Sequence, residues 1–221
     1  MEVIDLSMTL QPHWRWRVKR KLIQDLQQGD SLQVSLLTLN VHAFTHVDTP
    51  LHMLPGKITI DEVPLIQLVG PAAVVDLPFV GANEGIGVRD LQMATSHILP
   101  GDIVLLRTEW DLKRDWRARE YWTEAPYVEE EAAAWLAEQE IKAVGFDFPQ
   151  DYVIREMPSK HAPVEEMPTH HIILRRGIYL IEYLCNLHLI KANRVDLYVL
   201  PLKVRGAEAA PARALAVVDR A

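Results

Sequence analysis

The stretch His42-Ala43-Phe44-Thr45-His46-Val47-Asp48-Thr49-Pro50-Leu51-His52 holds three histidines and one aspartate within eleven residues. All four stand at even positions, so on an extended strand, whose side chains alternate between two faces, they project to the same side. A helix fits the pattern poorly, because Asp48 and His52 would point away from the first two histidines and Pro50 would remove a helix hydrogen bond. The stretch therefore predicts an extended segment with a polar cluster on one face.

A straight strand would hold His42 and His46 about 13 Å apart, at ~3.3 Å per residue. Convergence on one ion therefore requires a bulge or a bend between them. Neutral imidazole together with carboxylate suits zinc, manganese or iron, and an ion with an open coordination position lowers the pKa of a bound water toward neutrality. A lone histidine is more often a hydrogen-bonded structural residue, but four such groups on one side of a short segment favour a metal site.

The composition is that of a folded enzyme-sized chain. The 221 residues are 49% hydrophobic, which predicts one domain over residues 1–221. A net charge of −7 argues against a nucleic-acid partner. Basic residues cluster between positions 15 and 21, but Arg15 and Arg17 alternate with Trp14, Trp16 and Val18, which predicts a strand with one solvated face rather than a nucleic-acid site.

Nothing in the sequence indicates a membrane partner. The N-terminus lacks the basic and apolar regions of a signal peptide, and no apolar run approaches the ~20 residues that span a bilayer. We therefore expect a cytoplasmic protein. The single cysteine, Cys185, lies in an apolar run and is expected to be a packed thiol rather than a nucleophile.

The remaining pattern predicts an α/β fold. A helix is expected over residues 128–140, between two apolar runs that would form a parallel βαβ unit. Further strands are expected near both ends of the chain, and the one over residues 31–41 leads directly into the histidine-rich stretch. The expected strands are 3–10, 31–41, 72–77, 101–108, 141–148, 178–184 and 195–202.

The stretch 42–52 resembles the His-x-Gly-Thr-His-x-Asp-x-Pro-x-His signature of the cyclase-like metal-dependent hydrolases, the family of bacterial kynurenine formamidase and isatin hydrolase. Residues 168–182 and the closing segment 206–213 resemble the family as well. The resemblance implies a single-domain swivelling β/β/α fold that uses one or two zinc or manganese ions. It also implies hydrolysis of a small-molecule amide, lactam or lactone, and a homodimer or homotetramer.

Carried over by position, the resemblance gives each residue of the stretch a role. It implies that His42 and His46 bind one metal ion and that Asp48 bridges two. His52 would transfer protons, as an imidazole that titrates near neutral pH can. An alternative is a metal-binding or regulatory protein that keeps the fold without turnover, although metal storage alone would need no extra proton carrier.

The family also places a metal-binding histidine at the start of a helix and a metal-binding glutamate twelve residues later. His170 and Glu182 have this separation, while His171 is the competing choice for the histidine. Glu182 interrupts an apolar run, and a buried carboxylate is costly unless it is paired or bound to metal. Gly177 between them is expected to end the helix.

Three further assignments leave alternatives open. The resemblance implies that an aromatic residue of the loop after the first strand lines the substrate pocket, which makes Trp14 and Trp16 candidates, although either can be packed core or interface. Asp147 can support the site from behind or simply end a strand. Phe44 replaces the family's glycine, and we expect ordinary backbone dihedrals with the ring packed in the core, the alternative being a ring that projects beside the metals.

Overall fold

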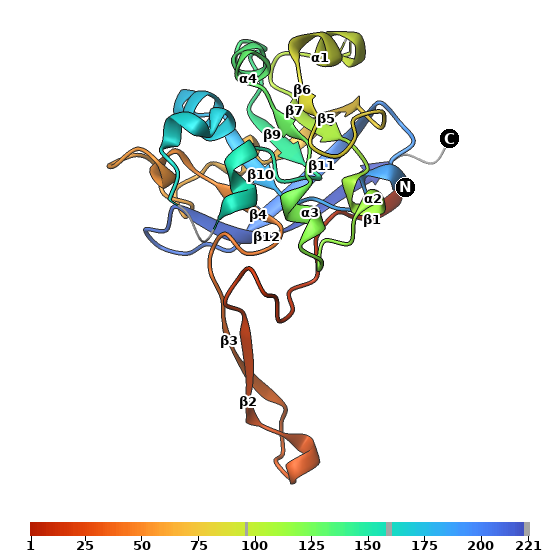
Figure 1. Cartoon of the computed structure of the whole chain (residues 1–221). Coiled ribbons are helices and arrows are strands. Elements are labelled where there is room, and N and C mark those ends of the chain that lie inside the picture. Colours follow the sequence, from red (N-terminus) through yellow and green to blue (C-terminus); the bar gives the residue numbers. More distant parts are fainter. Residues whose placement is uncertain (96, 158–160, 219–221) are drawn as a thin grey trace.

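The computed structural model describes residues 1–95, 97–157 and 161–218, and its centre is a mixed α/β fold in which strands close into a barrel (Figure 1). The ring closes because β12 pairs with β11 on one side and with β4 on the other. Farther along, β12 also pairs with β1 (Glu2–Asp5). In their pairing order the barrel strands are β12 (Ala209–Val218), β11 (Arg194–Pro201), β5 (Val69–Asp76), β7 (Ile103–Arg107), β9 (Ala143–Phe146), β10 (Tyr179–Glu182) and β4 (His46–Asp48). The predicted α/β class is confirmed.

The parallel part of the barrel explains the apolar runs of the sequence. Strands β5, β7, β9 and β10 run parallel, and strands covered on both faces read as continuous apolar segments. Helix α4 (Glu130–Ala137) connects β7 to β9, so the predicted βαβ unit is confirmed. The helix is shorter than expected because residues 127–128 form the short strand β8 (Tyr127–Val128), which pairs with β6 (Gly85–Ile86).

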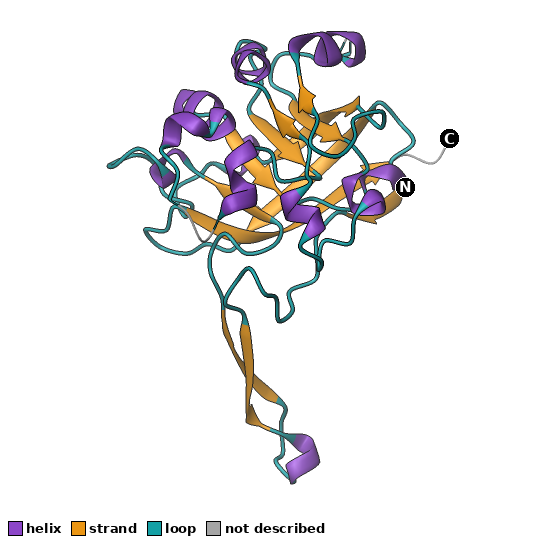
Figure 2. Cartoon of the chain, viewed as in Figure 1, coloured by secondary structure: helices purple, strands orange, loops and turns teal. Residues whose placement is uncertain are grey.

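Two hydrophobic clusters lie on opposite faces of the strands. Leu105 belongs to one and its neighbour Leu106 to the other, as the alternation of a strand requires. The cluster of Leu106 also holds the buried face of α4, whereas that of Leu105 holds side chains of β11 and β12. Figure 2 shows the helices around the strands, and the others are α1 (Val88–Ala94), α2 (Trp110–Lys113) and α3 (Glu120–Thr123).

One segment does not join this body. Residues Lys19–Thr38 project from it as a long two-stranded ribbon (Figures 1 and 2), here called the arm. It consists of β2 (Lys19–Gln24), the helical turn η1 (Leu26–Gln28) and β3 (Val34–Thr38), and its two strands pair with each other. The strand predicted over residues 31–41 is therefore an arm strand with exposed side chains, and the one predicted over residues 14–18 is absent because the chain bends there.

Short helical turns link the remaining strands. Gly177 has a φ of 83° and ends the last turn before β10, which confirms the predicted helix stop. The first strand ends at Asp5, earlier than expected, and Cys185 is buried as expected. The turns are η2 (Pro50–His52), η3 (Leu65–Gln67), η4 (Tyr152–Glu156), η5 (Val164–Glu166), η6 (Thr169–Ile173), η7 (Leu174–Arg176) and η8 (Leu187–Leu189). Among the described residues, no helix has the length and apolar character to cross a bilayer.

Candidate metal centre

The histidine-rich stretch bends at Phe44. This residue has a φ of 60°, in the left-handed region that glycine adopts readily and that costs other residues roughly 1–2 kcal/mol. The bend brings the His42 and His46 rings to a centroid separation of 5.2 Å. The predicted bend is thus present, but the expectation of ordinary dihedrals at Phe44 is wrong.

The Phe44 ring compensates by packing. It is fully buried, and its centroid lies 4.7 Å from that of Trp16 and 5.6 Å from that of Trp116. It does not line the pocket beside the histidines. The expectation that the ring serves the core is therefore confirmed, and burial of a large ring offsets the backbone strain.

Two antiparallel strands set the centre of the site. Strand β4 carries His46 and Asp48, and β10 carries Glu182, which lies directly opposite His46 in the register. All three side chains are buried. His46 Nε2 lies 3.2 Å from Asp48 Oδ1 and 3.5 Å from Glu182 Oε2. Barrel pairing thus brings together groups that are 136 residues apart in sequence, from position 46 to position 182.

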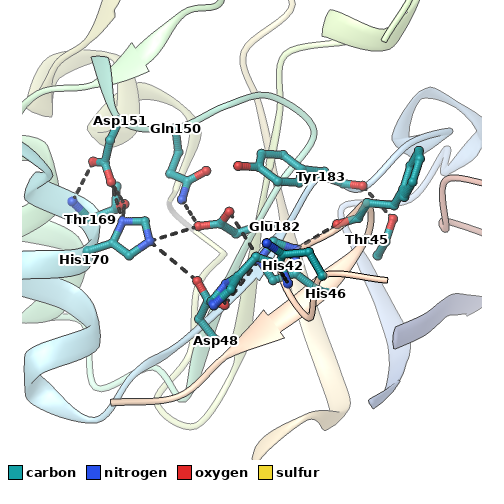
Figure 3. A network of polar contacts seen from close by, with 12 residues as sticks. His42, Thr45, His46, Asp48, Gln150, Asp151, Thr169, His170, Glu182 and Tyr183 are labelled. Atoms are coloured by element: carbon teal, nitrogen blue, oxygen red, sulfur yellow. Dashed lines mark hydrogen bonds and ion pairs between the residues drawn. The ribbon is translucent and has the colours of Figure 1, made fainter. Parts of the chain in front are cut away.

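His170 approaches the same carboxylates from the helical turn η6. Its Nε2 lies 3.3 Å from Glu182 Oε1 and 3.5 Å from Asp48 Oδ2 (Figure 3). Within the described residues, the side chain of His171, the competing choice, makes no hydrogen bond or ion pair with this cluster, and its buried Nδ1 has no hydrogen-bond partner. The structure therefore places His170, rather than His171, beside Asp48 and Glu182.

The hydrogen bonds of the two inner histidines fix the direction in which their lone pairs point. His46 Nδ1 lies 2.7 Å from the Phe44 carbonyl oxygen, which can only accept, so Nδ1 is the donor and Nε2 keeps a lone pair in the neutral ring. His170 Nδ1 likewise donates to Asp151 Oδ2 at 2.6 Å, so its Nε2 also keeps a lone pair in the neutral ring. Two imidazole lone pairs therefore face two carboxylates.

Such a set of acceptors calls for a cation. His46 Nε2 and both oxygens of Asp48 are buried without a hydrogen-bond partner among the described residues. In the metal-free protein, burial lowers the pKa of His170, but its hydrogen bond to Asp151 and its close contacts with the Asp48 and Glu182 carboxylates outweigh burial and raise the pKa well above its ordinary value. A divalent ion would replace such protons, because its ligands must be deprotonated. The imidazole nitrogens and carboxylate oxygens of the cluster are ligands that suit zinc or manganese.

His42 lies at the edge of the cluster. Its Nδ1 is 2.9 Å from Asp48 Oδ1 and its Nε2 is 3.2 Å from Glu208 Oε1. Burial lowers the pKa of His42, but the charges of Asp48, Glu182 and Glu208 outweigh it and raise the pKa to about 9. To bind metal, His42 must exchange one of these carboxylate contacts for the ion.

His52 lies at the mouth of the site. Its ring centroid is 4.2 Å from that of His42 and 5.4 Å from that of His170. Burial lowers its pKa, and the positive charges of His42 and His170 lower it further against the opposing effect of Asp48. Ligand atoms of His52, His42 and Asp48 also lie within 4.8 Å of one another. His52 is thus placed both for proton transfer and for metal binding.

Two residues that sequence reasoning missed hold the cluster from behind. Asp151 accepts from the Thr169 backbone N–H at 2.9 Å and its hydroxyl at 2.6 Å, in addition to His170. Gln150 donates to Glu182 Oε1. Two consecutive polar residues after an apolar strand were the only signal in the sequence.

Asp147, which the sequence indicated as a possible support of the site, stabilises a turn instead. It is buried and accepts from the backbone N–H of Thr108 at 3.0 Å and of Glu109 at 2.8 Å. Glu109 has a φ of 59°. Asp147 therefore stabilises the turn after β7 and touches none of the clustered histidines.

The cluster forms the floor of a pocket of about 330 Å³. Trp16 lines this pocket, whereas Trp14 lies outside it and donates from Nε1 to the Arg117 carbonyl. The Arg15 guanidinium lies in the wall of the pocket and donates to the carbonyl oxygens of Met157 at 2.6 Å and Ile154 at 2.9 Å. The other apolar lining residues are Met53, Ile154, Met157, Val164, Met167 and Tyr183. A few polar groups beneath apolar walls are typical of small-molecule sites.

The chain is similar to known proteins over nearly its whole length. A family model described as a putative cyclase matches residues 4–150. The kynurenine formamidase of Salinibacter ruber is 30% identical over 227 residues, 97% of each chain. That of Bordetella petrii is 31% identical over 205 residues, 93% of this chain and 86% of the relative.

Two solved structures extend the comparison to the fold. Isatin hydrolase A from Labrenzia aggregata superposes with a TM-score of 0.84 at 23% identity, over 99% of this chain and 94% of that chain. A potential metal-dependent hydrolase with cyclase activity superposes with a TM-score of 0.72 at 31% identity, over 97% and 96%.

Fold and site together define the chain as a hydrolase with a candidate metal centre. The family model covers more than half of the chain and the relatives align over most of its length. The chain belongs to the cyclase family, as its sequence predicts.

Proposed function

We propose that this protein is a metal-dependent hydrolase that cleaves the carbon–nitrogen bond of a small aromatic amide or lactam, with a lactone as the related ester substrate. The observation that carries the proposal is the arrangement of His46 and His170, whose lone pairs face Asp48 and Glu182 at the floor of an apolar pocket. The 30% identity to a protein named kynurenine formamidase supports the formamide class.

His46, Asp48, His170 and Glu182 would hold the ion, with His42 completing the set once it leaves Glu208. One or two ions of zinc or manganese suit these donors. Bound there, such an ion supplies Lewis-acid polarisation of the substrate carbonyl and a water of lowered pKa. Asp151 and Gln150 keep His170 and Glu182 in position, as hydrogen-bond partners of metal ligands do.

His52 is the proton carrier of the proposed reaction. It takes a proton from the attacking water and returns it to the leaving nitrogen, and its lowered pKa keeps the ring unprotonated and ready to accept at neutral pH. Trp16 and Met53 supply apolar walls for an aromatic ring and exclude bulk water from the reacting carbonyl.

A second candidate rests on the position of His52 beside His42 and Asp48. If His52 is a metal ligand, no imidazole at the mouth of the pocket is left to move protons, and a metal-binding or regulatory protein without turnover becomes the better description.

The deciding experiment is hydrolysis of N-formylkynurenine, isatin and a simple aryl lactone by protein loaded with zinc or manganese, followed by absorbance. Metal-dependent turnover of at least one substrate, absent in Asp48→Asn, is expected. A folded, metal-loaded protein that turns over none of the three would support the second candidate.

A further inference from the structure

The wall of the pocket holds one positive charge without a matching carboxylate among the described residues. Arg15 is half-buried, lines the pocket and forms no ion pair there. The other acidic and histidine side chains of the lining all belong to the candidate metal centre or its mouth, namely His42, Asp48, His52, His170 and Glu182. A charge taken out of water without a partner is costly. The burial of Arg15 therefore calls for a bound anion.

Three contacts fix the orientation of the Arg15 guanidinium. Its Nη1 donates to the Met157 carbonyl oxygen at 2.6 Å, and its Nη2 donates to the Ile154 carbonyl oxygen at 2.9 Å. Its central carbon lies 4.7 Å from the centroid of the Trp122 ring, which is fully buried. Backbone carbonyls and an aromatic face hold a guanidinium in place without carrying a full negative charge. The group is thus positioned in advance and remains a net cation.

The guanidinium has more donors than the protein uses. It carries five N–H groups in a planar fork, and the two carbonyl oxygens accept from two of them. The Nε–H and the second N–H of each terminal nitrogen have no protein acceptor in the part of the chain that the structure describes. A carboxylate matches such a fork, because its two oxygens accept two parallel charge-assisted hydrogen bonds.

Glu182 does not serve as this carboxylate. Its Oε1 lies 3.3 Å from His170 Nε2, and its Oε2 lies 3.5 Å from His46 Nε2. Burial lowers the pKa of Arg15, and the charges of Tyr183 and Glu182 oppose that effect without cancelling it. An ion bound by Glu182 would offset even this contribution, so the need for an anion at Arg15 is greatest when the metal site is filled.

The size of the pocket brings its walls close to its floor. The volume of about 330 Å³ lies at the lower end of the range for small-molecule sites, ~300–1,000 Å³. A ligand with one aromatic ring therefore fills most of the pocket. An amide carbonyl placed over Asp48 and His170 at the floor leaves the substituents of the ring beside the walls, one of which holds Arg15.

We propose that Arg15 is a specificity-determining residue that binds a carboxylate carried by the aromatic substrate. The preferred substrates are then anionic aromatic amides or lactams rather than neutral ones. The proposal rests on the hydrolysis proposed above, since it names the charge of the substrate that this site would cleave. Arg15 takes no part in breaking the bond, and it orients the ring so that the amide carbonyl lies at the metal cluster.

Substrate pairs that differ in one charge test the proposal by kinetics. The ortho, meta and para isomers of formamidobenzoate carry a carboxylate, and the matching formamidobenzamides are neutral and of nearly the same shape. With protein loaded with zinc or manganese, kcat/KM is expected to be about 10–100-fold higher for the carboxylate in at least one pair, the contribution of hydrogen bonds between charged groups. A parent that prefers the carboxylate in none of the three pairs would overturn the proposal.

Variants of Arg15 assign this preference to the guanidinium. Arg15→Gln removes the charge, so the ratio of the two kcat/KM values is expected to fall to about 1. A purely structural role would lower kcat/KM for both substrates alike and leave the ratio unchanged. Arg15→Lys keeps the charge without the planar fork and should retain part of the preference.

The matched control is Arg17→Gln. It makes the same change of charge two residues away, at an exposed side chain outside the pocket lining, and should keep the ratio of the parent. Circular dichroism and bound metal measured on all variants distinguish loss of the anion site from loss of fold. A ratio that Arg15→Gln leaves unchanged, or that Arg17→Gln abolishes equally, would refute the assignment.

A binding measurement separates this proposal from the proposed hydrolysis. Calorimetric titration of the metal-loaded protein with benzoate and with benzamide requires no turnover. Benzoate is expected to bind at least ~10-fold more tightly, with the advantage lost in Arg15→Gln and kept in Arg17→Gln. This pattern in a protein that hydrolyses nothing would refute the hydrolysis and leave the anion site standing. An advantage that Arg15→Gln retains would place the carboxylate on the metal ion and overturn the proposal.

Discussion

The metal cluster and the arm are incomplete in opposite ways. In the cluster, Asp48 and Glu182 are buried with histidine lone pairs directed at them, so polar groups removed from water are arranged to bind a cation. In the arm, Leu32 and Leu36 remain 62% and 54% exposed, so apolar groups left in water lack a protein surface. The same rule of compensation on burial predicts an ion in one region and an apolar contact surface for the other.

The largest effect is expected from Asp48→Asn, which tests the polar side of this comparison. The amide removes the negative charge shared by His42, His46 and His170. Bound metal, measured by elemental analysis, should fall below about a tenth of an equivalent, and kcat/KM should fall by at least ~10³. His171→Asn is the matched control and should retain its metal.

If His171→Asn lost metal while His170→Asn kept it, the assignment of the ligand would be reversed. If Asp48→Asn retained metal at the parent's level, Asp48 would not be a metal ligand. Its burial would then not predict an ion, and the comparison with the arm would fail.

The next effect concerns His52→Asn. A proton carrier that does not bind metal should keep the metal content and lower kcat by ~10² to 10⁴, the range of general acid and base groups. Elemental analysis and steady-state kinetics on the same preparation measure both quantities. Metal loss equal to that of His46→Asn would show that His52 is a ligand.

A smaller effect is expected from Asp151→Asn. Asp151 orients the His170 ring through a 2.6 Å contact and also holds Thr169, and loss of such a partner typically costs about 10–100-fold in metal affinity or activity. A chelator competition assay measures the affinity. Asp90→Asn, at the start of α1, removes a carboxylate far from the site and should leave the affinity unchanged.

Much of the site could be predicted because its signals are local. The even spacing of His42, His46, Asp48 and His52 reports a shared face, and Glu182 stands out in an apolar strand. The parallel strands and their crossover helix were likewise visible as continuous apolar runs. Each of these patterns is contained in one short segment.

What could not be predicted depends on where a segment lies in space. Strand-forming residues around Val34 and Leu36 predict a strand whether it packs on a core or stands in solvent, so the strand predicted over residues 31–41 gave no sign that it belongs to a projecting arm. Asp151 gained a role only because η6 brings His170 to it. Phe44 adopts a positive φ although residues other than glycine disfavour it, because burial of its ring offsets the backbone strain.

The smallest effect is the expected difference in stability between two substitutions of Phe44, which lies where the arm's root and the metal segment meet. Its ring packs on Trp16, which leads into the arm, while its φ of 60° sets the bend that positions His46. Phe44→Ala loses the ring and keeps the strain, and should lower the free energy of unfolding by about 3–5 kcal/mol. Phe44→Gly loses the ring but relieves the strain, so it should be more stable than the alanine variant by about 1 kcal/mol. Urea denaturation of both variants measures the difference. An alanine variant as stable as the glycine variant would show that the backbone relaxes to ordinary dihedrals once the ring is gone, which would make packing, rather than the metal segment, the origin of the bend.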